Sequence, residues 1–198
     1  MSANVSVTGW LLDSQSNRID FTGSATIAES QPAPDALKGA QVIRVTETIN
    51  GSLTAGGTTV PLSSSLNYYR NSSTMALAQI GDEGGDAAWE VYPSYTYPDT
   101  VKPNDGGPLA TALVYYGASP GTVVGTDALS YSVAADTGTS VLYTQVYKTL
   151  DNASRPVAET DETYRVTSQG AMALVSVHSA LFASSGATLM STDFTVQP

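Results

Sequence analysis

The sequence contains no cysteine, which excludes disulfide bonds, thiol nucleophiles and zinc sites built on cysteine ligands. It contains one histidine, so metal sites that need several imidazole ligands are excluded as well. Only 8 basic residues accompany 18 acidic ones, and the formal net charge of -10 leaves no basic stripe that could neutralise a phosphate backbone. We therefore expect no cofactor and no nucleic-acid partner.

Long apolar runs are also absent, since no stretch of about 18 apolar residues occurs that could span a membrane. The first residues, "MSANVSVTGW", lack the basic and apolar regions of a signal peptide. We expect no direct membrane insertion, and any membrane contact would come from a lipid anchor that this chain does not carry. Charged residues make up 13% of the chain, against about 25% in average domains, which predicts a neutral, hydroxyl-rich exterior.

The sequence does contain repeated alternation of apolar and polar residues, which is typical of strands with one solvated face. It is clearest in residues 19–28 ("IDFTGSATIA") and 128–136 ("ALSYSVAAD"), whereas residues 140–150 ("SVLYTQVYKTL") are apolar on both faces. The apolar faces of the first two segments carry Ile19, Phe21, Ala25, Ile27, Leu129, Tyr131 and Val133.

Turn signals, most of them containing glycine, separate these segments at short intervals, as expected for hairpins. They include Asn50-Gly51, Gly56-Gly57, Gly106-Gly107, Gly138, Asp151-Asn152 and Ser185-Gly186.

The predicted fold is all-β, an antiparallel meander that forms a sandwich, a barrel or a curved half-barrel. At most one or two short helices are expected. Residues 32–40 ("PAPDALKGA") form one candidate, with Pro34 in the first turn and Gly39 after its end, and residues 73–80 ("STMALAQI") form either a helix or an apolar strand. We interpret residues 1–198 as one domain, with a division near residues 90–95 as the alternative.

The segment "YPSYTYPDTVKPNDGG" at residues 92–107 is rich in tyrosine, proline and glycine. Together with the preceding Trp89, its tyrosines Tyr92, Tyr95 and Tyr97 could present flat faces to an apolar or glycan ligand. The prolines remove backbone donors, which favours an edge strand or crossover instead. We prefer a crossover packed by its own aromatic residues and keep the four aromatic side chains as ligand-binding candidates.

A calcium site is the one metal site that this composition permits, because calcium needs only oxygen ligands. The candidate is "GDEGGD", in which Asp82, Glu83 and Asp86 lie among glycines. The spacing does not match an EF-hand loop, so an acidic turn in solvent is the preferred interpretation.

Hydrolytic chemistry has two candidate groups. His178 could serve a Ser-His-acid triad, although no Gly-x-Ser-x-Gly elbow accompanies it, and a structural or surface histidine is the preferred interpretation. Paired carboxylates could hydrolyse glycosides. The acidic group Glu159, Asp161 and Glu162 lies beside Arg165, however, so local ion pairing is expected there.

Four features follow one another within residues 95–190: a Pro-x-x-Val-Lys-x-x-Asp-x-Gly segment, a Tyr-x-Val strand, an acidic and threonine-rich turn, and a Tyr-Arg-x-Thr-x-x-Gly segment. They are carried by Pro98, Val101, Lys102, Asp105, Gly107, Tyr131, Val133, Tyr164, Arg165, Thr167 and Gly170. This order resembles a group of uncharacterised proteobacterial cell-envelope lipoproteins. The resemblance implies the periplasm or cell surface of a bacterium, reached through a signal or anchor absent from this chain, with Met1 replacing the natural start.

Three functions remain open from the sequence. The first is a non-catalytic cell-envelope β domain, structural or ligand-binding and not an enzyme. The second is a self-assembling surface or virion subunit. The third is a small hydrolase that uses a serine with His178, or paired carboxylates. The oligomeric state is left undetermined.

Overall fold

The computed structural model describes residues 1–82, 88–93, 95, 97–117 and 121–198. Over these residues the chain forms one antiparallel sheet of 13 strands and no helix. The all-β prediction is therefore confirmed. The strands are β1 (Ser2–Leu12), β2 (Arg18–Glu29), β3 (Ala33–Leu37), β4 (Ala40–Ala55), β5 (Thr58–Asn71), β6 (Leu77–Ile80), β7 (Trp89–Val91), β8 (Gly106–Tyr116), β9 (Thr122–Thr137), β10 (Ser140–Asp151), β11 (Pro156–Thr167), β12 (Met172–Phe182) and β13 (Thr188–Val196).

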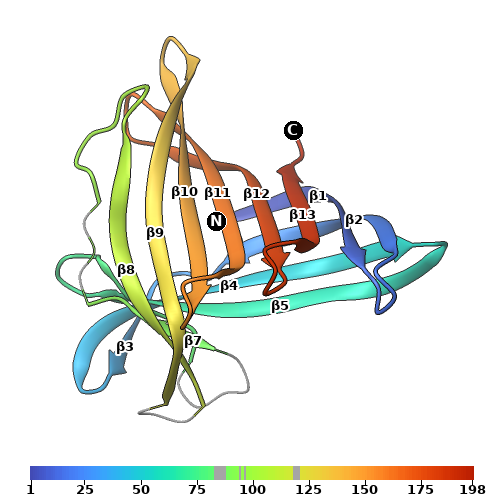
Figure 1. The fold of residues 1–198 in the computed structure, drawn as a ribbon. Coiled ribbons are helices and arrows are strands. Elements are labelled where there is room, and N and C mark those ends of the chain that lie inside the picture. The colour runs from blue at the N-terminus through green and yellow to red at the C-terminus, as the bar shows by residue number, and fades with distance from the viewer. Residues whose placement is uncertain (83–87, 94, 96, 118–120) are drawn as a thin grey trace.

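Two pairings between strands that are not consecutive close the sheet into a barrel of twelve strands (Figure 1). The first strand, β1, pairs with the last, β13, from Val5↔Val196 to Leu11↔Met190. Strand β2 pairs with β4 from Thr22↔Thr54 to Glu29↔Glu47, and β3 continues along β4 beyond the end of β2. Of the three predicted alternatives, the barrel is correct.

Strand β3 replaces the helix expected at residues 32–40. It pairs with the start of β4, from Ala33↔Arg44 to Leu37↔Ala40. Lys38 and Gly39 form the connecting turn, and both have positive φ, 50° and 81°, as in a two-residue hairpin loop. The helical prediction was wrong because backbone pairing with β4 outweighed the local helix signals. Residues 77–80 adopt the strand alternative, as β6.

The Asn50-Gly51 turn prediction was also wrong, because both residues lie inside β4. Gly51 permits a close approach of β2, since a Cβ atom at this position would lie 2.1 Å from the Ser24 carbonyl oxygen and 2.6 Å from the Ala25 Cα. Gly106-Gly107 likewise starts β8 and does not form a turn. The turns at Gly56-Gly57, Gly138, Asp151-Asn152 and Ser185-Gly186 are confirmed as the connections of β4–β5, β9–β10, β10–β11 and β12–β13.

The predicted apolar faces of β2 and β9 contribute to two core clusters. Phe21, Ala25 and Ile27 pack in the first cluster with Val5, Val7, Leu174 and Phe194. Leu129 packs in the second with Leu77, Ile80, Tyr92, Tyr95, Leu109 and Ala112. Ile19, near the start of β2, is exposed. One cavity of the candidate site is lined by residues of both clusters, among them Ile27, Phe194 and Ile80.

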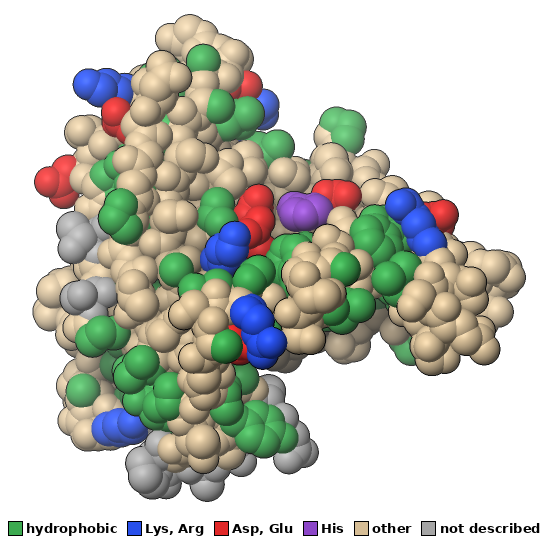
Figure 2. All heavy atoms as spheres, in the orientation of Figure 1, with side chains coloured by type: hydrophobic (Ala, Val, Ile, Leu, Met, Phe, Trp, Pro, Cys, Tyr) green, Lys and Arg blue, Asp and Glu red, His purple; other side chains and the backbone are tan. Residues whose placement is uncertain are grey.

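The face of the molecule shown in Figure 2 is covered mainly by neutral side chains and backbone, with acidic and basic groups scattered over it. This agrees with the expected neutral exterior. No helix among the described residues is long and apolar enough to cross a membrane.

Candidate functional site

Three adjoining cavities have polar and aromatic linings contributed by the barrel strands. The mouth cavity, about 550 Å³, lies between residues 97–103 and the β9–β10 and β11–β12 hairpins. The middle cavity is about 500 Å³ and the acidic cavity about 330 Å³. The mouth and middle cavities share Tyr97, Gln145 and Met172, and the middle and acidic cavities share Glu47, Tyr68, Tyr147 and Glu162.

Strand alternation places two glutamates in the linings of the middle and acidic cavities. On β4, Glu47 lies between Val45 and Ile49 on the face that also lines the cavities. On β11, Glu162 shares its face with Tyr164. An acidic residue in an otherwise apolar row of an alternating strand is a sequence signal that could have identified both positions.

Glu47 is enclosed with like charges nearby. Burial, together with the charges of Glu162 and Glu29, raises the pKa of Glu47 to about 7. Glu29 lies directly opposite Glu47 in the β2–β4 pairing, where like charges are unfavourable. Within the described part of the chain, neither the Glu47 carboxylate nor the Tyr68 hydroxyl has a hydrogen-bond partner.

Glu162 does have a partner. Burial raises the pKa of Glu162, while the hydrogen bond donated by the Tyr164 hydroxyl to its Oε2 at 2.9 Å opposes that shift. The positive charge of Arg70 also opposes it, to a smaller extent. Arg70 itself donates to the Tyr97 hydroxyl at 3.0 Å. Arg70 is the one arginine among the described lining residues of the middle cavity, and it is hydrogen-bonded to a tyrosine of the 92–107 segment.

A second pair of acids meets at the Tyr92 hydroxyl. This oxygen lies 2.8 Å from Glu90 Oε2 and 2.7 Å from Asp127 Oδ2. A phenol has one proton to donate, so two short contacts to carboxyl oxygens require a further proton on one of the acids. Burial raises the pKa of Glu90 to about 7, with Asp127 adding to the shift, and burial also raises the pKa of Asp127. The pair therefore shares a proton near neutral pH.

The aromatic candidates do not form one platform. Tyr92 and Tyr95 are buried, with ring centroids 6.3 Å apart, and Tyr95 lies 4.3 Å from Tyr97, which lines the mouth and middle cavities. Trp89 belongs to the opposite face of β7 from Glu90, is buried, and stacks on Tyr115 at 4.5 Å. The segment thus joins β7 to β8 with neighbouring tyrosines in contact. Of the four aromatic candidates, Tyr97 is the one in the described linings of the three cavities.

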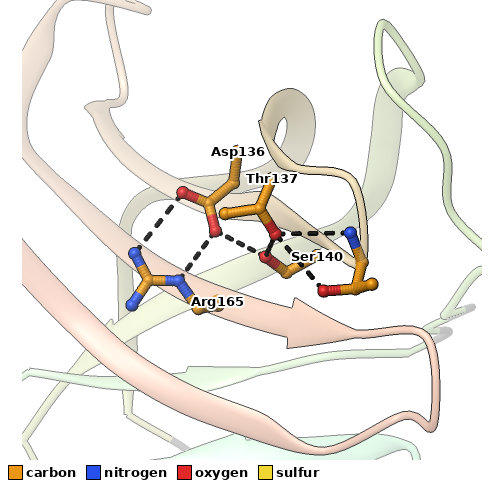
Figure 3. A network of polar contacts seen from close by, with 5 residues as sticks. Asp136, Thr137, Ser140 and Arg165 are labelled. Atoms are coloured by element: carbon orange, nitrogen blue, oxygen red, sulfur yellow. Dashed lines mark hydrogen bonds and ion pairs between the residues drawn. The ribbon is translucent and has the colours of Figure 1, made fainter.

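A polar network braces the rim of the mouth cavity (Figure 3). Arg165 on β11 donates from Nε to Asp136 Oδ2 at 2.8 Å, and the Ser140 hydroxyl donates to the same oxygen at 2.6 Å. The Thr137 hydroxyl donates to the Ser140 hydroxyl at 2.7 Å across the β9–β10 hairpin, because the Ser140 proton is already donated to Asp136. Arg165 therefore bonds to Asp136 on β9. The predicted local ion pairing of Arg165 with the acids of its own strand was wrong. Of those acids, Glu159 pairs with Lys148 on β10 at 3.2 Å.

The calcium candidate is partly outside the described residues, which include Asp82 but not Glu83 and Asp86. Both carboxylate oxygens of Asp82 accept hydrogen bonds, from Asn67 Nδ2 at 2.7 Å and from the Tyr69 hydroxyl at 2.5 Å. Among the residues that the structure describes, no group of three or more acidic or histidine side chains could hold a metal ion.

His178 is on the surface, and its Nδ1 lies 2.8 Å from Asp193 Oδ1 on β13. The hydrogen bonds of the described residues include none between this ring and a serine hydroxyl. The single histidine, purple in Figure 2, is visible on the outer surface.

Comparisons with protein-family models, with curated proteins and with solved structures found no match for this chain.

Proposed function

We propose that the protein is a non-catalytic ligand-binding barrel of a bacterial cell envelope, which encloses a small molecule in the middle and acidic cavities. The observation that carries this proposal is the set of polar groups shared by the two cavity linings. Glu47 and Tyr68 belong to that set and have no hydrogen-bond partner among the described residues. Both groups line the cavities, so a bound ligand or an ordered water molecule is the expected partner of each.

The size and chemistry of the linings support the same conclusion. Small-molecule sites are typically about 300–1,000 Å³, with mostly apolar walls and a few polar groups that fix orientation. The middle and acidic cavities, about 500 and 330 Å³, fall in this range. The acidic cavity adds aliphatic and aromatic side chains to its carboxylates, namely Ile27, Ile49, Leu66, Ile80, Val177, Phe194, Tyr68 and Tyr147.

The test is native mass spectrometry of the protein isolated from its own cells. We expect a small-molecule adduct that Ser64→Phe abolishes, because Ser64 lines the acidic cavity. The neighbouring Ser65 alternates to the outer face and is exposed, so Ser65→Phe is the matched control and should keep the adduct. If neither the parent protein nor the Ser65→Phe variant carries an adduct, the proposal is wrong.

The envelope location rests on the resemblance of residues 95–190 and is tested separately. The intact mass of the protein from membrane and soluble fractions should reveal a lipid-modified species in the membrane fraction. An unmodified species confined to the soluble fraction would contradict the envelope part and leave ligand binding unaffected.

The strand topology gives less support to self-assembly through strand edges than the cavities give to ligand binding. Each of the twelve barrel strands has two neighbours, although the short strands β6 and β7 cover only part of β5 and β8. Strand β3 has a single neighbour, β4, and is an edge strand of the described sheet. That strand carries Pro34 and Asp35, and prolines and charges on an edge discourage pairing with another chain.

A further inference from the structure

Resting on the proposed function, we infer that the ligand is an organic cation with an apolar body, held in the acidic cavity with its charged group at the carboxylates of Glu47 and Glu162. This goes further than enclosure of some small molecule, because it fixes the sign of the ligand charge and the position of its charged end.

The ionisable side chains in the described lining of the acidic cavity are mainly carboxyl groups. Four glutamates line the acidic cavity, and no lysine, arginine or histidine is among its described lining residues: the acids are Glu47, Glu90, Glu159 and Glu162. Lys148 neutralises Glu159 from outside the lining. Arg70 lines the adjoining middle cavity and is hydrogen-bonded to Tyr97. Glu47 has no hydrogen-bond partner among the described residues, and Glu162 is hydrogen-bonded to the neutral Tyr164 hydroxyl. A ligand cation would supply the positive charge that the described lining lacks.

Aromatic and aliphatic walls surround those acceptors. Tyr68, Tyr147 and Phe194 all line the acidic cavity. Aromatic faces attract cations, and by about 2 kcal/mol or more where the site is desolvated. The aliphatic side chains Ile27, Ile49 and Leu66 complete an apolar wall. This combination fits an amine with a hydrocarbon or aromatic body better than a polyhydroxylated sugar, which would leave its hydroxyls against apolar side chains.

Two competing ligand classes fit poorly. A metal ion needs several converging ligands, and the described residues contain no group of three acidic or histidine side chains placed to hold one. An anion would face four glutamates without a lysine, arginine or histidine in the described lining.

Proton linkage gives the inference a second readout. In the ligand-free protein, burial raises the pKa of Glu47 and of Glu90 to about 7, so these groups are partly protonated at neutral pH. A bound cation favours the ionised form and releases protons. Binding should therefore tighten from pH 6 to pH 8 and release protons measurably.

Isothermal titration calorimetry at pH 8 with three probes of matched size tests the charge of the ligand: 3-phenylpropylamine, 3-phenylpropanol and 3-phenylpropionate. We expect the amine to bind at least tenfold more tightly than the alcohol, and the carboxylate not to bind. Repeating the amine titration in buffers of different ionisation enthalpy measures the released protons. Equal affinities for amine and alcohol, or tightest binding of the carboxylate, would overturn the inference while leaving an interior binding site in place.

Variants locate the site. Glu47→Gln should weaken amine binding at least tenfold, whereas Asp20→Asn, which removes an acid from the exposed Arg18–Asp20 pair, should leave it unchanged. Tyr116→Phe, at an exposed tyrosine outside the three described cavity linings, should also keep the affinity of the parent protein. Equal binding by all three variants would place the amine outside the cavity and contradict the inference. No binding of any probe, together with no adduct in native mass spectrometry, would remove the proposed function as well.

Discussion

The Tyr92 hydroxyl lies 2.7 Å from Asp127 Oδ2 and so connects the aromatic segment before β8 to the wall strand β9. Thr149 on β10 donates to the other oxygen of Asp127 at 3.2 Å. Asp127 is fully buried, and a buried carboxyl group is tolerated only when its oxygens are satisfied. One acid thereby fixes the position of the segment relative to two strands of the barrel.

Tyr92→Phe removes the hydroxyl shared by Asp127 and Glu90. We expect the free energy of unfolding to fall by about 1–3 kcal/mol, because a buried carboxyl group loses its partner. Urea denaturation monitored by tryptophan fluorescence measures the change. The control is Tyr116→Phe at an exposed tyrosine, which should shift stability by less than about 0.5 kcal/mol. Equal stability of both variants and the parent protein would show that the Tyr92 contact does not support the fold.

Stability should decrease as the pH rises from about 4.5 to about 7. The pKa values of Glu47 and Glu90 are near 7 in the folded protein, above the usual 4.5, so the folded state binds more protons across this interval. The extra protons stabilise the folded state fully at pH values below the pKa of the unfolded chain. This stabilisation is lost as the pH rises through the folded-state pKa near 7. The total loss should be on the order of a few kcal/mol, since one pKa unit corresponds to about 1.4 kcal/mol.

Chemical denaturation at pH 5 and pH 8 measures this dependence. Glu47→Gln and Glu90→Gln should each flatten the profile, because an amide does not titrate. Asp20→Asn should leave the slope unchanged, as Asp20 lies in an exposed ion pair. A profile that rises between pH 5 and pH 7 would contradict the enclosed, partly protonated glutamates.

Gly51→Ala should destabilise the closure of the barrel. The added Cβ would lie 2.1 Å from the Ser24 carbonyl oxygen, so β2 and β4 would have to separate. We expect a loss of about 1–3 kcal/mol or more, as in other overpacked sites. The control is Gly138→Ala, where no atom lies within 4 Å of the added Cβ. If thermal denaturation shows equal effects for both substitutions, the close approach at Gly51 is not required.

Arg165→Ala should loosen the rim of the mouth cavity without unfolding the barrel. The Arg165–Asp136 pair is half-exposed on the arginine side, so its contribution to global stability should be below about 1 kcal/mol. Hydrogen exchange should nevertheless accelerate at the Ser168 amide, which donates to the Thr139 carbonyl across the rim at 3.0 Å. Arg155→Ala is the control, because Arg155 pairs with Asp151 inside a single hairpin. Unchanged exchange at the rim would contradict a bracing role.

The sequence by itself determined the local part of the structure. Alternation with period two predicted the all-β class and the apolar faces of β2 and β9, and glycine signals such as Gly56-Gly57 predicted hairpins, because both depend on residues close together in the chain. The same local rules failed at residues 32–40 and at Gly51. There, pairing with strands from elsewhere decided the conformation.

Only the tertiary structure decided that the sheet closes and what its enclosed acids face. The β2–β4 and β1–β13 pairings distinguish a barrel from a sandwich, and neither is specified by the hairpin signals. Alternation could place Glu47 on an apolar face. It could not show that Glu29 lies opposite or that the charge of Glu162 acts on it, because these three residues come from separate strands. The environment of a charge inside a barrel depends on contacts between strands distant in sequence, and those contacts exist only once the barrel is closed.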